Sequence, residues 1–445
     1  MKFLIENLHP INNLKVGELC FLTGVFFLPS ALPISLIFFL VSIAISLSKN
    51  GFLFFSDKYN QILFVCSGLM IFSCINSTLN LSQITNQTAS NIFLGLANWI
   101  PYFILFYSSQ IYLNNAEKRK MFSRVFISGS LPLIVSCILQ SIFKIYGPFK
   151  TLYGSVVWFQ EPINPFRGIT GLFSNQNYTG LWLTILLIFL FYEIKSSKRN
   201  WKIKFLPTIL ISLTAYFLIL TESRNAFFGM LIGIFSFLKR KFLLIIPLFL
   251  SFFLVMQRLI FNNISQNLIF FDNLFNIKLF NKLFAFDFAN FLNYPRIEIY
   301  SLASKFILKS PLLGWGPSTF HILYERDWIT NNPGILEYPR FQHTHNITFE
   351  LAYNFGIPLA IIMSLFIFKI LKKALFIIFE KSKKNEEFLI NKTWFIAVII
   401  MLVSQINDVT YYDGKISILI WILLAGLKSL IEEKIPKKLN KPKIL

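Results

Sequence analysis

Four side chains in the second half of the sequence have chemistry suited to binding a phosphate group and to accepting a proton. Arg224 stands in LTESRNAFFGM, Arg296 in PRIEIY, and His343 and His345 in HTHN. A guanidinium group stays charged and binds phosphate oxygens through paired N–H donors, so an arginine can stabilise a departing diphosphate. Histidine has an ordinary pKa of about 6.5, so it can accept a proton from an attacking hydroxyl group.

The two arginines also have explanations that involve no substrate. Arg224 could hold its charged end at a membrane surface and pair with Glu222. Arg296 could form an ordinary ion pair within a loop, with Glu298 or Asp287 as its partner. Both interpretations stay open beside the one in which these arginines bind a diphosphate.

The two histidines compete for the role of general base. His345 is followed directly by Asn346 and an apolar run, which anchors its backbone, whereas His343 lies two residues further out. We therefore predict that His345 is the base and that His343 contacts substrate. For both, the alternative is an interfacial residue at a helix start without catalytic duty. Glu350 does not share a helical face with His345, so we leave it outside the catalytic set.

Polar residues near other predicted helix ends are further candidates. Asn177 is predicted to bind substrate, although an asparagine at such a position more often starts a helix. Asp408 lies at the end of a later apolar run, where polar groups usually have a partner or a task. The external segments show neither an Asp-x-Asp element nor His, Cys and Asp residues at metal-binding spacing. We therefore predict chemistry without a metal or a cofactor.

The composition places these residues in a membrane protein. Hydrophobic residues make up 55% of the 445 positions and charged residues 14%, whereas roughly a quarter of a soluble protein is charged. The net charge of +21 does not indicate nucleic-acid binding. Its basic residues come in short clusters between apolar runs, as they do in cytoplasmic loops.

The apolar runs predict an all-α polytopic protein with about twelve transmembrane helices. Leu19–Ser48 is too long for one span and is interrupted by Pro29 and Pro33, so we expect two short helices there. Asn225–Leu238 is short for a span. The other predicted spans are Gln61–Thr78, Ile92–Leu113, Val125–Tyr146, Gly168–Tyr192, Ile203–Thr221, Lys241–Met256, Ile347–Ile370, Thr393–Thr410 and Ile416–Ile431.

One long hydrophilic stretch, Gln257–His345, separates the ninth predicted span from the tenth. It divides the chain into a membrane domain (1–256), a large loop (257–345) and a second membrane domain with a basic tail (346–445). Within the loop, the apolar and charged residues that follow Arg296 predict a short amphipathic helix. Pro311 should end this helix, and the glycines of LLGWGPSTF should form a tight turn.

The positions of lysine and arginine predict the orientation. Most of the 42 basic residues, including Lys118–Lys120 and Lys195–Lys204, fall in segments that are cytoplasmic if the N-terminus is inside. On the opposite side, the loop Leu79–Asn91 carries no charge. The positive-inside rule therefore predicts a multi-pass protein of the plasma (inner) membrane with both termini in the cytoplasm. The large loop is then extracytoplasmic, without access to ATP or nucleotide sugars.

Four motifs in this order resemble the O-antigen ligase/Wzy-type polymerase superfamily. They are GITGLFSNQNYTG, LTESRNAFFGM, PRIEIYSLASKFILKSPLLGWGPSTF and HTHNITFELAYNFGIP, which together run from about Gly168 to Ala360. The N-terminal third of the chain is similar in topology alone. The resemblance implies a GT-C-like, metal-independent glycosyltransferase in which Arg224, Arg296 and His345 occupy the family's functional positions.

The implied reaction moves a glycan from a polyprenyl diphosphate carrier to an acceptor hydroxyl, on a lipid or a glycan, at the outer face of the membrane. Ligases and polymerases both need diphosphate-binding arginines and an acceptor site, and the single large external loop favours a ligase. The alternative from another class is a multi-pass transporter, such as the relatives proposed to accumulate inorganic carbon. A transporter would predict internal repeats and helices broken or charged at mid-membrane, and the sequence shows no clear repeat.

Overall fold

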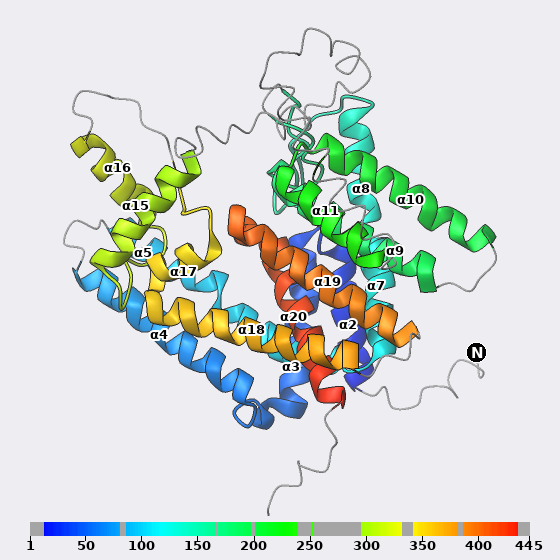
Figure 1. The fold of residues 1–445 in the computed structure, drawn as a ribbon, viewed down its shortest axis with the longest axis horizontal. Helices are drawn as coiled ribbons and strands as arrows, with labels where there is room; N and C mark the ends of the chain where they lie inside the picture. Colours follow the sequence, from blue (N-terminus) through cyan, green and yellow to red (C-terminus); the bar gives the residue numbers. More distant parts are fainter. Residues whose placement is uncertain are drawn as a thin grey trace, which may run out of the picture.

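The computed structural model describes residues 13–80, 86–164, 167–196, 201–238, 251, 295–331, 341–380 and 386–434. Within these ranges the chain is mostly helical (Figure 1). Seven helical segments are long and apolar enough to cross a membrane, as expected of a polytopic membrane protein. They are Leu32–Asn50, Lys58–Leu79, Ala89–Tyr112, Ala116–Ser141, Gln176–Ser196, Glu386–Asn407 and Gly414–Glu433. The total of about twelve stays a prediction, and most of the predicted span Lys241–Met256 lies outside the described residues.

The prolines of the first apolar run separate two helices, as predicted. α2 (Asn13–Phe27) and α3 (Leu32–Asn50) lie against each other, and the Ser35 hydroxyl donates to the carbonyl of Gly24 at 2.7 Å. Pro33 sits in the first turn of α3, where its missing N–H removes no helical hydrogen bond. The prolines therefore set the start of the second helix.

The next helices follow the predicted spans with shifted ends. α7 starts well before the predicted Val125, because Asn115 caps it by accepting a hydrogen bond from the Lys118 N–H at 2.9 Å. A basic segment predicted to be a loop is thus helical. The elements in this part are α4 (Lys58–Asn80), α5 (Asn86–Leu94), η2 (Gly95–Asn98), α6 (Ile100–Ser109), η3 (Gln110–Tyr112), α7 (Ala116–Gly129), α8 (Leu131–Ser141) and the hairpin β1 (Phe149–Thr151) with β2 (Val156–Trp158).

α9 (Gln176–Ser196) begins later than the predicted Gly168. The preceding segment is not helical, because its backbone N–H groups at Thr170 and Gly171 donate to the side-chain oxygen of Gln140 instead, at 3.0 and 2.8 Å. α10 (Trp201–Leu220) and α11 (Arg224–Phe237) both pack against α9. α11 has 14 residues, which agrees with the prediction of a short apolar helix there.

The predicted tenth span, Ile347–Ile370, is two helices and not one. α17 (Ile347–Phe355) and α18 (Ile357–Glu380) meet at Gly356, whose φ is +91°. A side chain at this glycine would meet the carbonyl oxygen of Leu312 at 2.1 Å. The break exists because the chain near Leu312 packs into it, and the Ile357 N–H donates to Pro311 O at 2.8 Å.

The predicted amphipathic helix is present as α15 (Pro295–Lys309), and its apolar side is buried toward α17. The tight turn after it is also confirmed, with φ values of +69° at Gly314 and +86° at Gly316. Its backbone is fastened to α17, since Trp315 N donates to Tyr353 O at 2.7 Å. α16 (Phe320–Asn331) follows, and α15, α16 and α17 lie together at one end of the molecule (Figure 1). The preceding stretch, Gln257–Asn293, lies outside the described residues.

The core is organised around the last helix, α20 (Gly414–Lys434). It is buried along nearly its whole length, and α6, α18 and α19 (Glu386–Asn407) pack against it. Between α19 and α20 the chain makes a short connection that contains Asp408 and the 3-10 turn η7 (Thr410–Tyr412). This connection lies at the same end of the bundle as the start of α17, because α17 contacts α19.

Candidate active site

The loop that carries both histidines is anchored at the start of α17. Asn346 caps this helix by accepting hydrogen bonds from the N–H groups of Thr348 (2.9 Å) and Phe349 (3.2 Å). Its own amide nitrogen donates to the carbonyl of Ile406 at 3.0 Å, which ties the loop to the end of α19. His345 precedes this cap with a φ of +56°, an unusual value for a residue with a side chain. The anchored backbone predicted for His345 is thus present.

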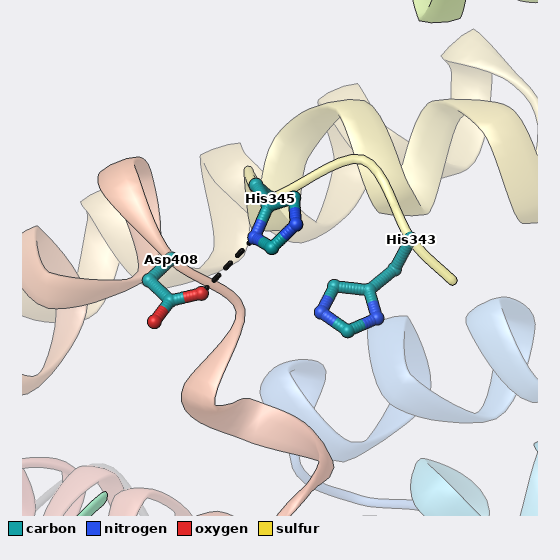
Figure 2. A group of neighbouring side chains, drawn as sticks. All are labelled: His343, His345 and Asp408. Atoms are coloured by element: carbon teal, nitrogen blue, oxygen red, sulfur yellow. Dashed lines mark hydrogen bonds and ion pairs between the residues drawn. The ribbon is translucent and has the colours of Figure 1, made fainter. Parts of the chain in front are cut away.

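His345 is held by a carboxylate from the connection between α19 and α20. Its Nδ1 lies 3.2 Å from Oδ1 of Asp408 (Figure 2). The other oxygen of Asp408 accepts a hydrogen bond from the side-chain amide of Asn177 in α9, at 2.7 Å. Burial raises the pKa of Asp408, but the hydrogen bond and charge of His345, the charge of Arg296 and the Asn177 amide together outweigh it, so the pKa lies below its ordinary value.

This contact defines which nitrogen of His345 can act on a substrate. A neutral imidazole that donates its Nδ1 proton to Asp408 presents Nε2 as a proton acceptor. The carboxylate would also stabilise the imidazolium that forms when Nε2 takes up a proton. The His345 side chain is 25% exposed, so a substrate can reach it. The pair therefore has the arrangement that general-base chemistry needs.

His343 lies beside this pair and is oriented differently. Its ring centre is 4.8 Å from that of His345 and 5.8 Å from the ring of Tyr412 (Figure 2). Burial lowers the pKa of His343 below its ordinary value, and the charge of His345 acts in the same direction, against the opposite effect of Glu350. A neutral His343 can hydrogen-bond a substrate hydroxyl, but the structure shows no carboxylate bonded to its ring among the described residues.

Glu350 is the centre of a buried network that supports the histidine loop. One of its oxygens accepts hydrogen bonds from the N–H and the hydroxyl of Thr344, both at 2.9 Å. The other accepts from the Tyr412 hydroxyl at 2.7 Å and from the Asn354 amide at 3.1 Å. Because Thr344 lies between the two histidines and Tyr412 follows Asp408, this carboxylate joins the two loops that form the site. No hydrogen bond joins Glu350 to His345, and the exclusion of Glu350 from the catalytic set stays a prediction.

The two arginines stand at helix starts near this site. Arg296 begins α15, is half-buried, and acts electrostatically on Asp408 and on Tyr300, whose hydroxyl is 3.4 Å from the carbonyl oxygen of His345. Among the described residues Arg296 forms no ion pair, so the alternative of a salt bridge with Glu298 finds no support. The other suggested partner, Asp287, lies outside the described residues.

Arg224 begins α11 and is exposed, with Ser223 capping the helix. The adjacent Asn225 donates its side-chain N–H to the carbonyl of Ser404 at 2.7 Å, and Ser404 stands about one helical turn before Asp408. This contact brings the start of α11 toward the same end of α19. That Arg224 and Arg296 face a common cavity stays a prediction.

One protein family matches the part of the sequence that contains both arginines and both histidines. The family model for O-antigen ligase (Wzy_C) matches residues 209–364. This segment is similar to the O-antigen ligase/Wzy-type superfamily. The comparison with curated proteins finds no match. The matched segment includes Arg224, Arg296 and both histidines, whereas Asn177 and Asp408 lie outside it.

The site also contains a possible set of metal ligands. His343, His345 and Asp408 each offer one donor atom, and these atoms lie within 4.8 Å of one another (Figure 2). Imidazole nitrogen and carboxylate oxygen are donors that zinc accepts. The 3.2 Å separation between His345 and Asp408 is that of a hydrogen bond, so a metal would have to replace this contact. Independence from metal therefore stays a prediction.

Two parts of the site were not expected from the sequence. The sequence marks Asp408 as a polar group near a helix end, but no sequence pattern links it to a histidine 63 positions away. No sequence pattern singles out Tyr412. The available signal for both is that they lie in a short connection between two apolar runs, where carboxyl and hydroxyl groups need partners.

Proposed function

We propose that this protein transfers a glycan from a polyprenyl diphosphate carrier to an acceptor hydroxyl at the outer face of the plasma membrane. A ligase that joins a glycan to a lipid is favoured, with a polymerase close behind. The observation that carries the proposal is the His345–Asp408 pair, which leaves Nε2 of His345 available within a region that matches O-antigen ligase.

In the proposed step, Nε2 of His345 takes the proton of the acceptor hydroxyl as its oxygen attacks the anomeric carbon of the donor sugar. The new bond is carbon–oxygen, and the bond that breaks joins the anomeric carbon to the diphosphate oxygen. The polyprenyl diphosphate leaves with the electron pair, and the proton on His345 later passes to water. Asp408 stabilises the imidazolium in the interval, as a positioning residue that does not touch the substrate.

Arg296 and Arg224 would bind the diphosphate and stabilise the charge that grows on it. Two guanidinium groups suit this task because a diphosphate carries more charge than one of them offsets, and planar N–H pairs match phosphate oxygens. With arginines in this role, the reaction needs no metal. His343 and Asn177 would contact the sugars. The side-chain oxygen of Asn177 has no partner among the described residues, while its amide nitrogen serves Asp408.

The larger arrangement is part of the same proposal. It comprises a GT-C-like membrane domain of about twelve helices, cytoplasmic termini, and an extracytoplasmic loop over residues 257–345 between membrane domains 1–256 and 346–445. Support comes from the seven apolar segments and from α15, which packs onto α17 beside the histidine loop. A transporter would use a broken helix to bind solute, yet the break at Gly356 is filled by the chain near Leu312. The family match gives the transporter no support.

The test uses the full-length protein in liposomes with a polyprenyl-diphosphate-linked oligosaccharide and a lipid acceptor. Arg296→Ala is compared with Arg326→Ala, which removes an exposed arginine from α16. Glycan attachment and glycan length are measured beside solute uptake. The proposal expects transfer that Arg296→Ala abolishes and Arg326→Ala preserves. Uptake that depends on Arg296, without any transfer by the unmodified protein, would reject it in favour of transport.

A further inference from the structure

We propose that a groove along α18 binds an anionic phospholipid, at a site separate from the candidate active site. The groove has a volume of about 1230 Å³ and lies between α18 and Ile431 of α20. We call it the lysine groove, because three lysines complete a wall that is otherwise apolar. Its lining includes Lys369, Lys372, Lys373, Leu365, Phe368 and Phe376.

The three lysines are unusual for a helix of this kind. α18 has 24 residues and is otherwise strongly apolar, yet the lysines stand in its second half, about 18 to 24 Å from Ile357 at 1.5 Å per residue. An ammonium group in hydrocarbon is costly, so such residues reach toward a polar surface or bind a partner. α17 starts beside the histidine loop and α18 continues from its other end, so the groove in the second half of α18 lies away from His345.

The neighbouring carboxylates are already used by another lysine. Lys428 of α20 pairs with Asp57 at 2.6 Å and with Glu432, and its Nζ is 4.9 Å from the ring centre of Tyr59. Lys369 and Lys373 also approach this ring, with Nζ at 5.7 and 5.6 Å from its centre. In the part of the chain that the structure describes, no carboxylate pairs with the lysines of the groove. They therefore add positive charge that no carboxylate of the described residues pairs with directly.

A phospholipid can contact both the lysines and the apolar side chains of this groove. Phe368 and Phe376 are 60% and 63% exposed, and their rings offer an apolar surface to acyl chains. The three ammonium groups, spaced at i, i+3 and i+4 on one side of the helix, can hydrogen-bond the oxygens of one phosphate. Basic pockets between transmembrane helices recognise anionic head groups in this way. A free phosphate would use the lysines alone and leave the aromatic wall uncovered.

The experiment titrates the purified full-length protein with dioleoyl phosphatidylglycerol or dioleoyl phosphatidylcholine and counts bound lipids by native mass spectrometry. We expect tighter binding of the anionic lipid. The double variant Lys369→Gln/Lys373→Gln should weaken that binding roughly 25-fold, from about fivefold for each lysine. Lys369→Arg/Lys373→Arg should retain it. The matched control, Lys15→Gln/Lys204→Gln, removes the same charge from α2 and α10 and should leave binding unchanged.

Three results would overturn the proposal. They are equal binding of the two lipids, equal loss in the groove variant and its control, and displacement of phosphatidylglycerol by millimolar inorganic phosphate. The last would show that the lysines bind free anions without the acyl chains. His345→Ala should leave lipid binding intact, so failure of the proposed glycan transfer would not be confused with failure of the lysine groove.

Discussion

The two ends of α19 hold charged clusters that are built in different ways. Near its start, Arg119 of α7 is 1% exposed and uses three nitrogens: Nε donates to Asn391 Oδ1 (3.0 Å), Nη1 to Leu113 O (2.9 Å) and Nη2 to Glu433 (2.8 Å). At its other end, about 25 Å away, His345 uses Nδ1 toward Asp408 and keeps Nε2 available.

This difference indicates that Arg119 stabilises the fold, whereas His345 is available for chemistry. A buried guanidinium whose three nitrogens each donate a hydrogen bond holds helices α7, α19 and α20 together, and its burial keeps it from a ligand. A half-exposed imidazole with one bonded nitrogen is oriented but still reactive. The comparison predicts that substitutions near the start of α19 reduce stability, whereas substitutions at its end reduce activity.

The largest expected effect on activity is at His345. His345→Ala should reduce glycan transfer about 10² to 10⁴-fold, the usual contribution of a general base, while the protein still inserts and binds polyprenyl diphosphate. His343→Ala should cost much less, because no described carboxylate orients that ring. Transfer rate and donor affinity are measured in parallel, with the exposed His321→Ala of α16 as the control. If His343→Ala abolishes transfer and His345→Ala does not, the two assignments must be exchanged.

The two ends of α19 can be compared directly through their arginines. Arg119→Ala should lower stability by about 3–5 kcal/mol, because Glu433 and Asn391 lose a buried partner. Arg296→Lys should leave the melting temperature unchanged and reduce transfer roughly 10² to 10³-fold, since the planar N–H pair is lost although the charge remains. Arg224→Lys is expected to match Arg296→Lys. A normal melting temperature with lost transfer in Arg119→Ala, and a lowered melting temperature with normal transfer in Arg296→Lys, would contradict this assignment of structural and chemical roles.

Much of the helical framework could be predicted from the sequence, because apolar runs and helix-breaking residues act locally. The break at Pro29 and Pro33 and the amphipathic helix from Arg296 follow from such signals. The break at Gly356 had a signal that was missed, since Gly356 is followed by Pro358, the common pattern of one helix ending and another starting. The break is hard to see in the sequence because the residues on both sides of Gly356 are largely apolar.

The candidate site was predictable in its residue types but not in its contacts. Histidine and arginine can be recognised as candidates from their side-chain chemistry alone. The hydrogen bond between His345 and Asp408, in contrast, joins residues 63 positions apart in the sequence. No local sequence pattern predicts a contact between residues so far apart in the chain. The rejection of Glu350 as a partner of His345 was sound on helical spacing, yet its bonds to Thr344 and Tyr412 depend on two loops that meet only in the folded protein.

A smaller effect is expected at Glu350, which supports the site without contacting substrate. Glu350→Gln keeps the side-chain size but places an N–H group among donors from Thr344, Asn354 and Tyr412. We expect a roughly tenfold loss in the transfer rate at saturating donor, with donor affinity unchanged, as for other residues that orient a functional group. Glu298→Gln, at an exposed position on α15, is the control. An equal loss of transfer rate in Glu350→Gln and Glu298→Gln would show that Glu350 does not position the site.

The lowered pKa of His343 predicts a pH-dependent stability. Because the folded protein disfavours the charged imidazole, the unfolded chain binds the proton more readily just below pH 6.5. The stability from a neutral His343 is therefore present above about pH 6.5 and is lost as the pH falls toward the folded pKa. Melting temperatures of the unmodified protein and His343→Gln should diverge above that pH and converge below it. A difference independent of pH would contradict the burial of a neutral ring.

Removing metal ions should have the smallest effect, none within error. If arginines stabilise the diphosphate, dialysis against EDTA leaves the transfer rate unchanged. Added Zn²⁺ should instead inhibit, because the donors of His343, His345 and Asp408 lie within 4.8 Å of one another and a bound ion would occupy the base. Asp408→Asn should weaken that inhibition by removing one ligand. Loss of transfer in EDTA that Zn²⁺ restores would show that this end of α19 is a metal centre, and His345 would then be a ligand and not the base.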